Sequence, residues 1–395
     1  MNFDAAGAAR LQQYFDRIGA LLGTPQRRSS FALYASGLFS AAERKSVEPL
    51  AVHACPDPSK ADAAHQRLLH FISDSEWNDH MVRREAAAEG LAAMTAHGPV
   101  EAWIIDDTGF LKQGSHSVGV QRQYTGSAGK ITNCQIGVSL TIATHTEQLP
   151  IDFRLYLPES WTNDKARRRE ARIPASVGFQ TKPELALTMI RRALLDGVPP
   201  GVVLADSAYG SSSDFRRELR QLGLRYAVAV APNTKVVLTD DRDPIPQSVS
   251  DIAATLETEG AFRRCTWREG TGGELCARFA RCRIRVAEDE EVWLLIEWRH
   301  GETEPANYFF ASFSRTTTTK QLVRIAMQRW RTERAYEDLK GELGLDHYEG
   351  RRYPGWNHHV SVALACYAFI VAERSRRFSP SAGGPMETNA HHLAA

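Results

Sequence analysis

The sequence lacks the features of a membrane or secreted protein. No apolar run approaches the roughly 20 residues that a membrane-spanning helix needs. The first residues, MNFDAAGAARLQQYF, contain neither the basic start nor the apolar stretch of a secretion signal. We therefore expect a cytoplasmic protein without a membrane partner.

Paired cysteines and an excess of charge of either sign are also absent. The six cysteines include no Cys-x-x-Cys pair, and several lie in apolar runs such as VALACYAFI. This distribution is typical of buried free thiols and makes a zinc site the weaker interpretation. Lysine and arginine number 48 against 47 acidic residues, so net charge alone neither indicates nor excludes a polyanionic partner.

What the sequence does contain is a change from helical to strand patterns along a chain of 395 residues, too long for one ordinary core. Residues 1–95 carry apolar side chains at helical spacing and predict a helical N-terminal domain. Residues 96–233 alternate strand and helix patterns, and residues 234–315 are rich in strands. An uninterrupted helical pattern opens residues 316–376, and residues 377–395 have the composition of a disordered tail. The sequence therefore predicts a mixed α/β fold of several domains.

Two short apolar runs each end at an aspartate. WIID ends at Asp106 and GVVLAD ends at Asp206. Ligand sites of open sheets lie beyond the carboxyl ends of their strands, so we expect the two carboxylates to meet at one edge. For either residue alone, a helix or turn cap is the competing interpretation.

The helical pattern QRWRTERAYEDLK supplies a third carboxylate, Glu333. Arg329 lies four residues before it and Lys340 seven residues after it, so the three side chains project from nearly one face of the helix. A solvated face of ion pairs is the competing interpretation of this run.

Together, the segments DDT, LADSAYG and RWRTERAYEDLK resemble the DDE insertion-sequence transposases, in particular the subgroup founded on insertion sequence 701. The similarity is strongest in DDTGFLKQGSHSVGVQRQYTGSAGKITNCQIGVSL and GELGLDHYEGRRYPGWNHH, and it extends over most of residues 25–372. It implies a ribonuclease-H-like catalytic core that follows a helical, DNA-binding N-terminal domain. Residues 234–315 would then be a β-rich insertion between the second and third acids.

The wider relatives share a Tyr, Arg, Glu, Lys signature on the helix that carries the catalytic glutamate. In this sequence Arg329, Glu333 and Lys340 match the last three residues of that signature. The tyrosine position falls on Ala326, so any phosphate contact from a phenol at that position is missing.

The first acid of the resemblance has two candidates, because Asp106 and Asp107 both precede Thr108. Side chains alternate along a strand, so only one of the two can face a metal site. We favour Asp106, which keeps an acid-x-Thr spacing, with Asp107 as the alternative. With Asp206 and Glu333 it would supply the oxygen ligands that two Mg²⁺ ions prefer, and Mn²⁺ is expected to substitute.

Contacts with DNA are expected from residues around these acids. The loop after Asp107 is rich in glycine and cations, which favours an approach to phosphates, although an ordinary flexible hairpin has the same composition. The phosphate-binding residues that we expect are Arg329, Lys340, Arg122, Lys130 and His347. Trp298 and Trp330 are the candidates for stacking on an unpaired base, against the more common place of tryptophan in a core.

The function that the resemblance implies is a DNA transposase of the cut-and-paste type. Its partners would be double-stranded DNA, as terminal inverted repeats and as target, and a second copy of the chain that bridges two ends at the bacterial nucleoid. The alternatives are a domesticated or inactive relative that binds DNA without cutting and a ribonuclease-H-like nuclease that cuts without joining. A structural protein whose acids are caps and ion pairs is the third alternative.

Overall fold

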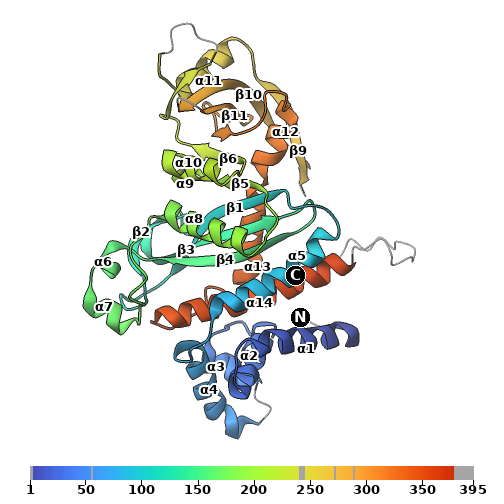
Figure 1. Ribbon diagram of the computed structural model, residues 1–395, viewed down its shortest axis with the longest axis vertical. Helices are drawn as coiled ribbons and strands as arrows, with labels where there is room; N and C mark the ends of the chain where they lie inside the picture. The colour runs from blue at the N-terminus through green and yellow to red at the C-terminus, as the bar shows by residue number, and fades with distance from the viewer. Residues whose placement is uncertain (1–2, 55–56, 240–244, 271–272, 288–289, 378–395) are drawn as a thin grey trace.

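The computed structural model describes residues 3–54, 57–239, 245–270, 273–287 and 290–377. The molecule is elongated, with the N-terminal helices at one end, a mixed sheet in the middle and the strand-rich residues at the other end (Figure 1). The predicted disordered tail, apart from Arg377, lies outside the described residues. None of the helices in these ranges combines the length and the hydropathy of a membrane-spanning segment.

The N-terminal region of the described chain consists of helices packed around the C-terminal helix. These helices are α1 (Ala5–Ala20), α2 (Pro25–Leu38), η1 (Pro58–Lys60), α3 (Val47–Ala54), α4 (Ala61–Ser73) and α5 (Asp79–Thr95). Asp4 caps α1 by accepting the amide hydrogen of Gly7 at 2.6 Å. The C-terminal helix α14 (Tyr353–Arg377) is buried along most of its length, and Tyr14 donates a hydrogen bond to its Ala365 carbonyl at 2.8 Å. The last helix therefore forms much of the core of the first region.

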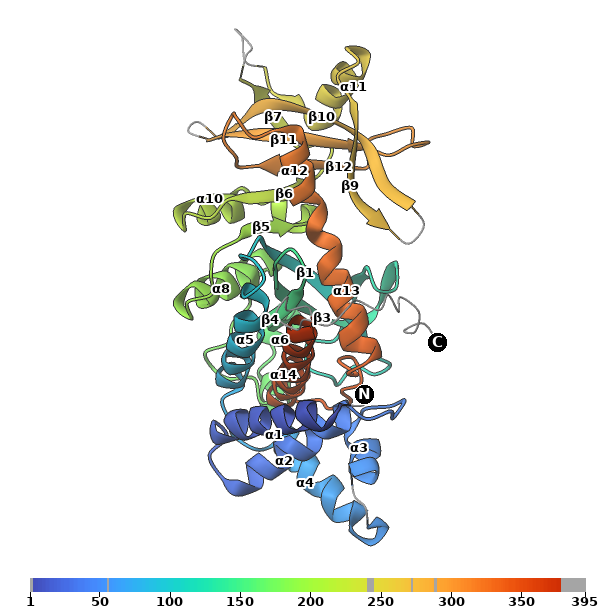
Figure 2. The same ribbon diagram turned by 90° about the vertical axis from the view of Figure 1, so that its right-hand side faces the viewer.

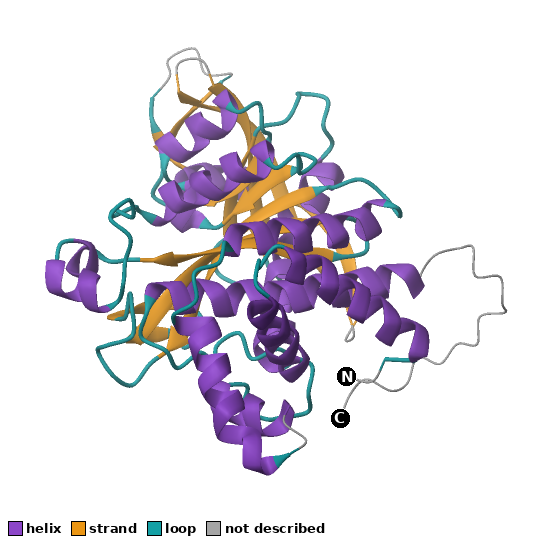
Figure 3. Cartoon of the chain, turned by 60° about the horizontal axis from the view of Figure 1, so that its bottom comes forward, coloured by secondary structure: helices purple, strands orange, loops and turns teal. Residues whose placement is uncertain are grey.

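The central sheet has the mixed strand directions expected of a ribonuclease-H-like core. Its order is β2 (Gln121–Thr125), β3 (Lys130–Ala143), β1 (Ala102–Leu111), β5 (Val202–Ala205) and β6 (Tyr226–Val230), with β4 (Gln148–Tyr156) also paired to β3. Strand β1 is antiparallel to β3 and parallel to β5, and β5 is parallel to β6. Helices lie on both sides of the strands (Figure 3). The mixed α/β class predicted from the sequence is confirmed.

Alternation along β1 separates the two faces of the sheet. Trp103 belongs to the larger buried cluster, which also contains residues of α8 (Lys182–Leu195). Ala102 and Ile104 belong to a second cluster, with residues of α12 (Thr319–Ala326). Successive side chains on a strand point to opposite faces, so the even-numbered residues of β1 face the helices that follow α12.

The strand that carries the adjacent acids is longer than the sequence pattern predicted. We expected it to end at Asp106, but it keeps pairing with β3 as far as Leu111, which lies opposite Cys134. Both adjacent carboxylates therefore lie in mid-strand. The expected position of an aspartate directly after a strand occurs at Asp206, which follows β5.

The strand-rich region continues the central sheet. It contains β7 (Lys235–Leu238), β8 (Gln247–Ser248), α11 (Val249–Thr258), β9 (Arg263–Gly270), β10 (Gly273–Ala287), β11 (Glu290–Trp298) and β12 (Asn307–Ala311). Strand β12 pairs with β6, so the strands join one twelve-stranded sheet within the described chain. Helix α11 was not predicted; a capping box of Ser248 and Asp251 begins it.

The helical pattern after residue 316 was expected to be uninterrupted, and this expectation was wrong. Helix α12 is followed by a 3₁₀ turn, η2 (Met327–Arg329), and then by α13 (Trp330–Gly341). Figure 2 shows these elements as one rod that runs from the strand-rich end past the central sheet. The remaining helices of the described residues are α6 (Glu159–Thr162), α7 (Lys165–Glu170), α9 (Ser207–Gly210) and α10 (Ser213–Gln221).

The described cysteines form no disulfide, and only some of them are buried. Cys134 and Cys366 are buried, as predicted, whereas Cys265, Cys276 and Cys282 are partly exposed. The partly exposed residues lie on β9 and β10. The prediction of buried thiols was therefore wrong for these strands, and Cys55 lies outside the described residues.

Candidate active site

The parallel pairing of β1 and β5 brings the first two candidate acids together. Ala102 pairs with Val202 and Ile104 with Leu204, and this register places Asp106 beside Asp206. Asp206 caps α9 by accepting the amide hydrogen of Ala208 at 2.9 Å. Asp206 is therefore a helix cap, as the competing interpretation proposed, and it also lies within electrostatic range of Asp106.

Asp106 is a buried carboxylate on the face of the sheet that α13 covers. It is 9% exposed; one oxygen accepts the amide hydrogen of Asp107 at 2.8 Å, and the other lies 3.3 Å from Nη2 of Arg329. Burial raises the pKa of Asp106 to about 6, because removal from water disfavours the charged form, while Arg329 opposes the shift and Asp206 adds to it.

Arg329 is the cation at the centre of this cluster. Burial lowers the pKa of its guanidinium, but the carboxylates of Asp106, Asp206 and Glu333 act against burial and raise that pKa above its usual value. Glu333 itself lies one turn further along, in the first turn of α13, and is exposed. Arg329 thus pairs with Asp106 and lies within electrostatic range of Asp206 and Glu333.

The alternative first acid, Asp107, faces the other side of the sheet. Its Oδ2 accepts hydrogen bonds from Nζ of Lys182 at 2.9 Å and from the hydroxyl of Tyr209 at 3.0 Å. These partners belong to α8 and α9. The geometry favours Asp106 as the acid that shares a face with Arg329 and Asp206.

Lys340, the second cation of the helix, contacts the same strand beyond the acids. Its Nζ donates to Thr108 Oγ1 at 2.7 Å and to the Gly109 carbonyl at 2.9 Å, and lies 3.4 Å from Ser127 Oγ. Burial lowers the pKa of this ammonium. In this structure Lys340 fastens the end of α13 to β1, next to the acids.

Hydroxyl pairs that sequence reasoning missed hold α13 against β3. The hydroxyls of Thr332 and Thr141 are 2.6 Å apart, as are those of Tyr336 and Ser139. Thr332 and Tyr336 lie on either side of Glu333 in the helix sequence. Their contacts with β3 therefore fix the position of α13 along the strand and its rotation about its own axis, and so the direction of the Glu333 side chain. The four-residue spacing of Thr332 and Tyr336 is visible in the sequence. Their partner hydroxyls, on Thr141 and Ser139, lie far away in the sequence, so these contacts could not be predicted from it.

The position of the missing tyrosine is part of the core in this chain. Ala326 is 2% exposed and belongs to the buried cluster between α12 and the sheet. The side chain at this position therefore packs in the core between α12 and the sheet.

The remaining predicted contacts are spread over the molecule. Arg122 and Lys130 are exposed on the hairpin formed by β2 and β3. His347 lies beside the N-terminal region, where its Nδ1 accepts the amide hydrogen of Lys45 at 3.0 Å. This contact gives His347 a structural role, and its role towards DNA stays a prediction.

Both tryptophans predicted to stack on a base are engaged within the protein. The guanidinium of Arg268, from β9, lies 3.6 Å from the ring centroid of Trp330. Trp298, on β11, donates to the Glu302 carbonyl at 2.9 Å and packs edge-on against Phe262. Base stacking by either ring would require these contacts to be exchanged.

The donor atoms of the three acids are chemically suited to a hard divalent cation. All are carboxylate oxygens, the ligands that such ions prefer. Within the described ranges, no three His, Cys, Asp or Glu side chains are already gathered closely enough to hold one ion. In this structure the guanidinium of Arg329 supplies the positive charge beside the acids.

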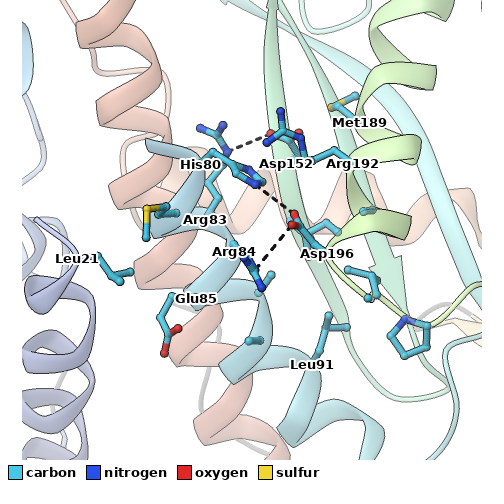
Figure 4. A pocket seen from close by; sticks show the side chains of 18 residues that line it. Leu21, His80, Arg83, Arg84, Glu85, Leu91, Asp152, Met189, Arg192 and Asp196 are labelled. Carbon is cyan, nitrogen blue, oxygen red and sulfur yellow. Dashed lines mark ion pairs between the residues drawn. The ribbon is translucent and has the colours of Figure 1, made fainter. Parts of the chain in front are cut away.

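A cavity of about 420 Å³ lies between α5 and α8, away from the acids (Figure 4). Several of its charged side chains are paired: Asp196 lies 3.3 Å from Nε2 of His80 and 3.7 Å from Nε of Arg84, and Asp152 lies 3.0 Å from Nε of Arg83. The lining includes none of the three acids. We interpret this cavity as a structural junction of α5 with the sheet.

The mixed sheet and its covering helices are consistent with a ribonuclease-H-like core, in which Asp106 lies on β1, Asp206 follows β5 and Glu333 lies on α13. The family described as "DDE superfamily endonuclease" matches residues 17–274, more than half of the chain. The chain therefore belongs to the DDE superfamily endonucleases, and this membership implies a nuclease activity. The match includes Asp106 and Asp206 and ends before Glu333.

The chain is also similar to a protein described as "Probable transposase for insertion sequence element IS701" from Microchaete diplosiphon. The two are 27% identical over 319 residues, which cover 80% of this chain and 76% of the relative. This similarity confirms the resemblance noted in the sequence and covers most of both proteins.

Proposed function

We propose that this protein is the transposase of an insertion sequence, which binds the terminal inverted repeats and cuts and joins DNA strands. The observation that carries the proposal is the placement of Asp106 beside Arg329 on the face of the sheet that α13 covers, with Asp206 directly after the neighbouring parallel strand and Glu333 on α13. Membership of the endonuclease family and similarity to the IS701 protein support it.

In the proposed reaction Asp106, Asp206 and Glu333 hold divalent metal ions, Mg²⁺ with Mn²⁺ as a substitute. Such ions supply a nucleophile at neutral pH and charge neutralisation at the phosphate. Arg329 contributes a fixed positive charge beside the acids, where it can bind a phosphate oxygen of the strand being cut. Lys340 contacts Thr108, two residues beyond Asp106, and would bind a neighbouring phosphate.

The proposed partners are double-stranded DNA and a second copy of the chain. Arg122 and Lys130 are exposed and available to the DNA backbone. Cleavage before two ends are paired would leave broken DNA, so we propose that a homodimer bridges the ends. The N-terminal helices would bind the repeats, and the protein would act on the bacterial nucleoid.

The test is cleavage of a labelled duplex that carries the flanking inverted repeat, with Mg²⁺ present. Glu333→Gln and Asp206→Asn are expected to abolish cleavage. Glu337→Gln is the matched control, because Glu337 lies one turn further along α13, is exposed and pairs with Arg334. Equal cleavage by the Glu333 and Glu337 variants would contradict the proposed site.

A second assay separates the proposed transposase from its rivals. Products in which the cut end is joined to a target duplex support a transposase, whereas cleavage without joining favours a nuclease. Binding of the repeat without cleavage by the wild type favours the inactive, DNA-binding relative.

A further inference from the structure

The hairpin of β2 and β3 presents an exposed apolar pair. Tyr124 lies directly opposite Ile131 in the strand register. The two side chains are 63% and 61% exposed. Among the aromatic side chains that the structure describes, Tyr124 has the largest exposed fraction. Covering large apolar side chains removes them from water, so this exposed pair is suited to contact with a partner.

The turn of the same hairpin is fastened to the strand that carries the candidate acids. Ser127 Oγ accepts the amide hydrogen of Gly109 at 3.2 Å and lies 3.0 Å from Thr108 Oγ1. Lys340 from α13 approaches the same Ser127 hydroxyl at 3.4 Å. Thr108 is two residues beyond Asp106, so the hairpin is held against the edge of the candidate active site.

The charge around the pair fits a polyanion. The sequence has no acidic residue between Asp107 and Glu147, whereas Lys112, Arg122 and Lys130 lie within that interval. Arg122 is two residues from Tyr124 on β2 and shares its face, whereas Lys130 adjoins Ile131 on β3 and points to the other face; both cations are exposed. Cations that flank an apolar pair are suited to a nucleic acid strand, whose phosphates and base faces alternate in the same way.

We propose that Tyr124 and Ile131 contact the bases next to the cleaved phosphate, with Tyr124 stacking on a base that the distorted duplex exposes. Arg122, which lies on the same face of the hairpin as Tyr124, holds a phosphate next to that base. The inference rests on the proposed function and adds to it the surface that reads the DNA at the cut. It assigns the stacking role to Tyr124 in place of Trp298 and Trp330, whose rings are engaged within the protein.

The test compares Tyr124→Ala, Tyr124→Phe and a control, Leu195→Ala, on the repeat duplex with Mg²⁺. Leu195 is 84% exposed on α8 and serves as an exposed apolar residue outside the hairpin. Loss of one base-stacking contact is expected to lower the affinity of Tyr124→Ala for the duplex by roughly 5- to 150-fold. Tyr124→Phe and Leu195→Ala are expected to stay close to the wild type.

A duplex with 5-iodouracil beside the cleavage position gives a second measurement. Irradiation of the wild-type complex is expected to cross-link this base to the peptide that contains Tyr124. A cross-link to another segment, or unchanged affinity in Tyr124→Ala while the wild type cuts the duplex, overturns the inference and leaves the proposed function standing. Absence of cleavage by the wild type rejects the proposed function itself.

Discussion

The adjacent carboxylates of β1 are predicted to affect stability in opposite directions. Asp106 is buried and its pKa is raised from 3.8 to about 6, chiefly by that burial. Each pKa unit corresponds to about 1.4 kcal/mol, so keeping Asp106 charged costs the metal-free protein about 3 kcal/mol above pH 7. Replacing it with asparagine removes the charge at nearly the same volume.

The sign of the pH dependence follows from the direction of the shift. The folded protein binds a proton at Asp106 more tightly than the unfolded chain does, so Asp106 makes the wild type less stable as pH rises through the window from about 4 to about 6. Asp106→Asn should match the wild type near pH 4 and exceed its free energy of unfolding by about 3 kcal/mol at pH 8.

The assay is urea unfolding of both proteins in EDTA at a series of pH values, with the difference between them plotted. Asp107→Asn is the control: it weakens the hydrogen bonds from Lys182 and Tyr209 and should destabilise the protein by about 1–3 kcal/mol. An Asp106→Asn protein no more stable than the wild type at pH 8 would refute the assignment of a buried, strained charge to this residue.

Three further predictions use other parts of the structure. Addition of Mn²⁺ at a hundred times its dissociation constant should stabilise the wild type by about 2.7 kcal/mol in thermal unfolding. It should leave the stability of Asp106→Asn unchanged, because that variant lacks one of the three carboxylates that would bind the ion. The double variant Arg122→Ala, Lys130→Ala should reduce the salt dependence of DNA binding, measured as log K against log salt, by a slope of about 2, since each phosphate contact contributes about 0.9. Burial lowers the pKa of His359, whose Nδ1 lies 2.8 Å from the Tyr34 hydroxyl, to about 4. The wild type should therefore lose about 3 kcal/mol as pH falls from 6.5 to 4, and His359→Asn should flatten that dependence in urea titrations; an equal slope in both proteins would contradict it.

The sequence predicted the part of the site that local patterns determine. Asp206 directly follows a short apolar strand, and the parallel pairing of that strand with β1 brings Asp106 beside it, as expected. Arg329 and Glu333 are also one turn apart, as the helical spacing predicted, although a 3₁₀ turn ends at Arg329 and α13 begins after it. These features depend on side chains that lie within a few residues of each other.

The sequence could not predict features that depend on distant segments. Strand β1 extends beyond its apolar run because β3 continues to pair with it as far as Leu111. The partners of Asp107 come from 75 and 102 residues further along the chain. Ser127 meets Thr108 only because the hairpin turns back over the strand. Each of these contacts is set by tertiary packing, for which a single sequence carries no local signal.

The two adjacent aspartates are compatible with a buried strand because a strand separates neighbours onto opposite faces. Asp106 meets Arg329 on the side covered by α13, and Asp107 meets Lys182 on the side covered by α8. Each carboxylate is thus paired with a cation from a different side of the sheet. The helices on the two sides therefore contact consecutive residues of one strand. A shift of β1 by a single residue would exchange the two environments, so the hydrogen bonds from Lys182 and Tyr209 to Asp107 also fix Asp106 towards Asp206 and Arg329.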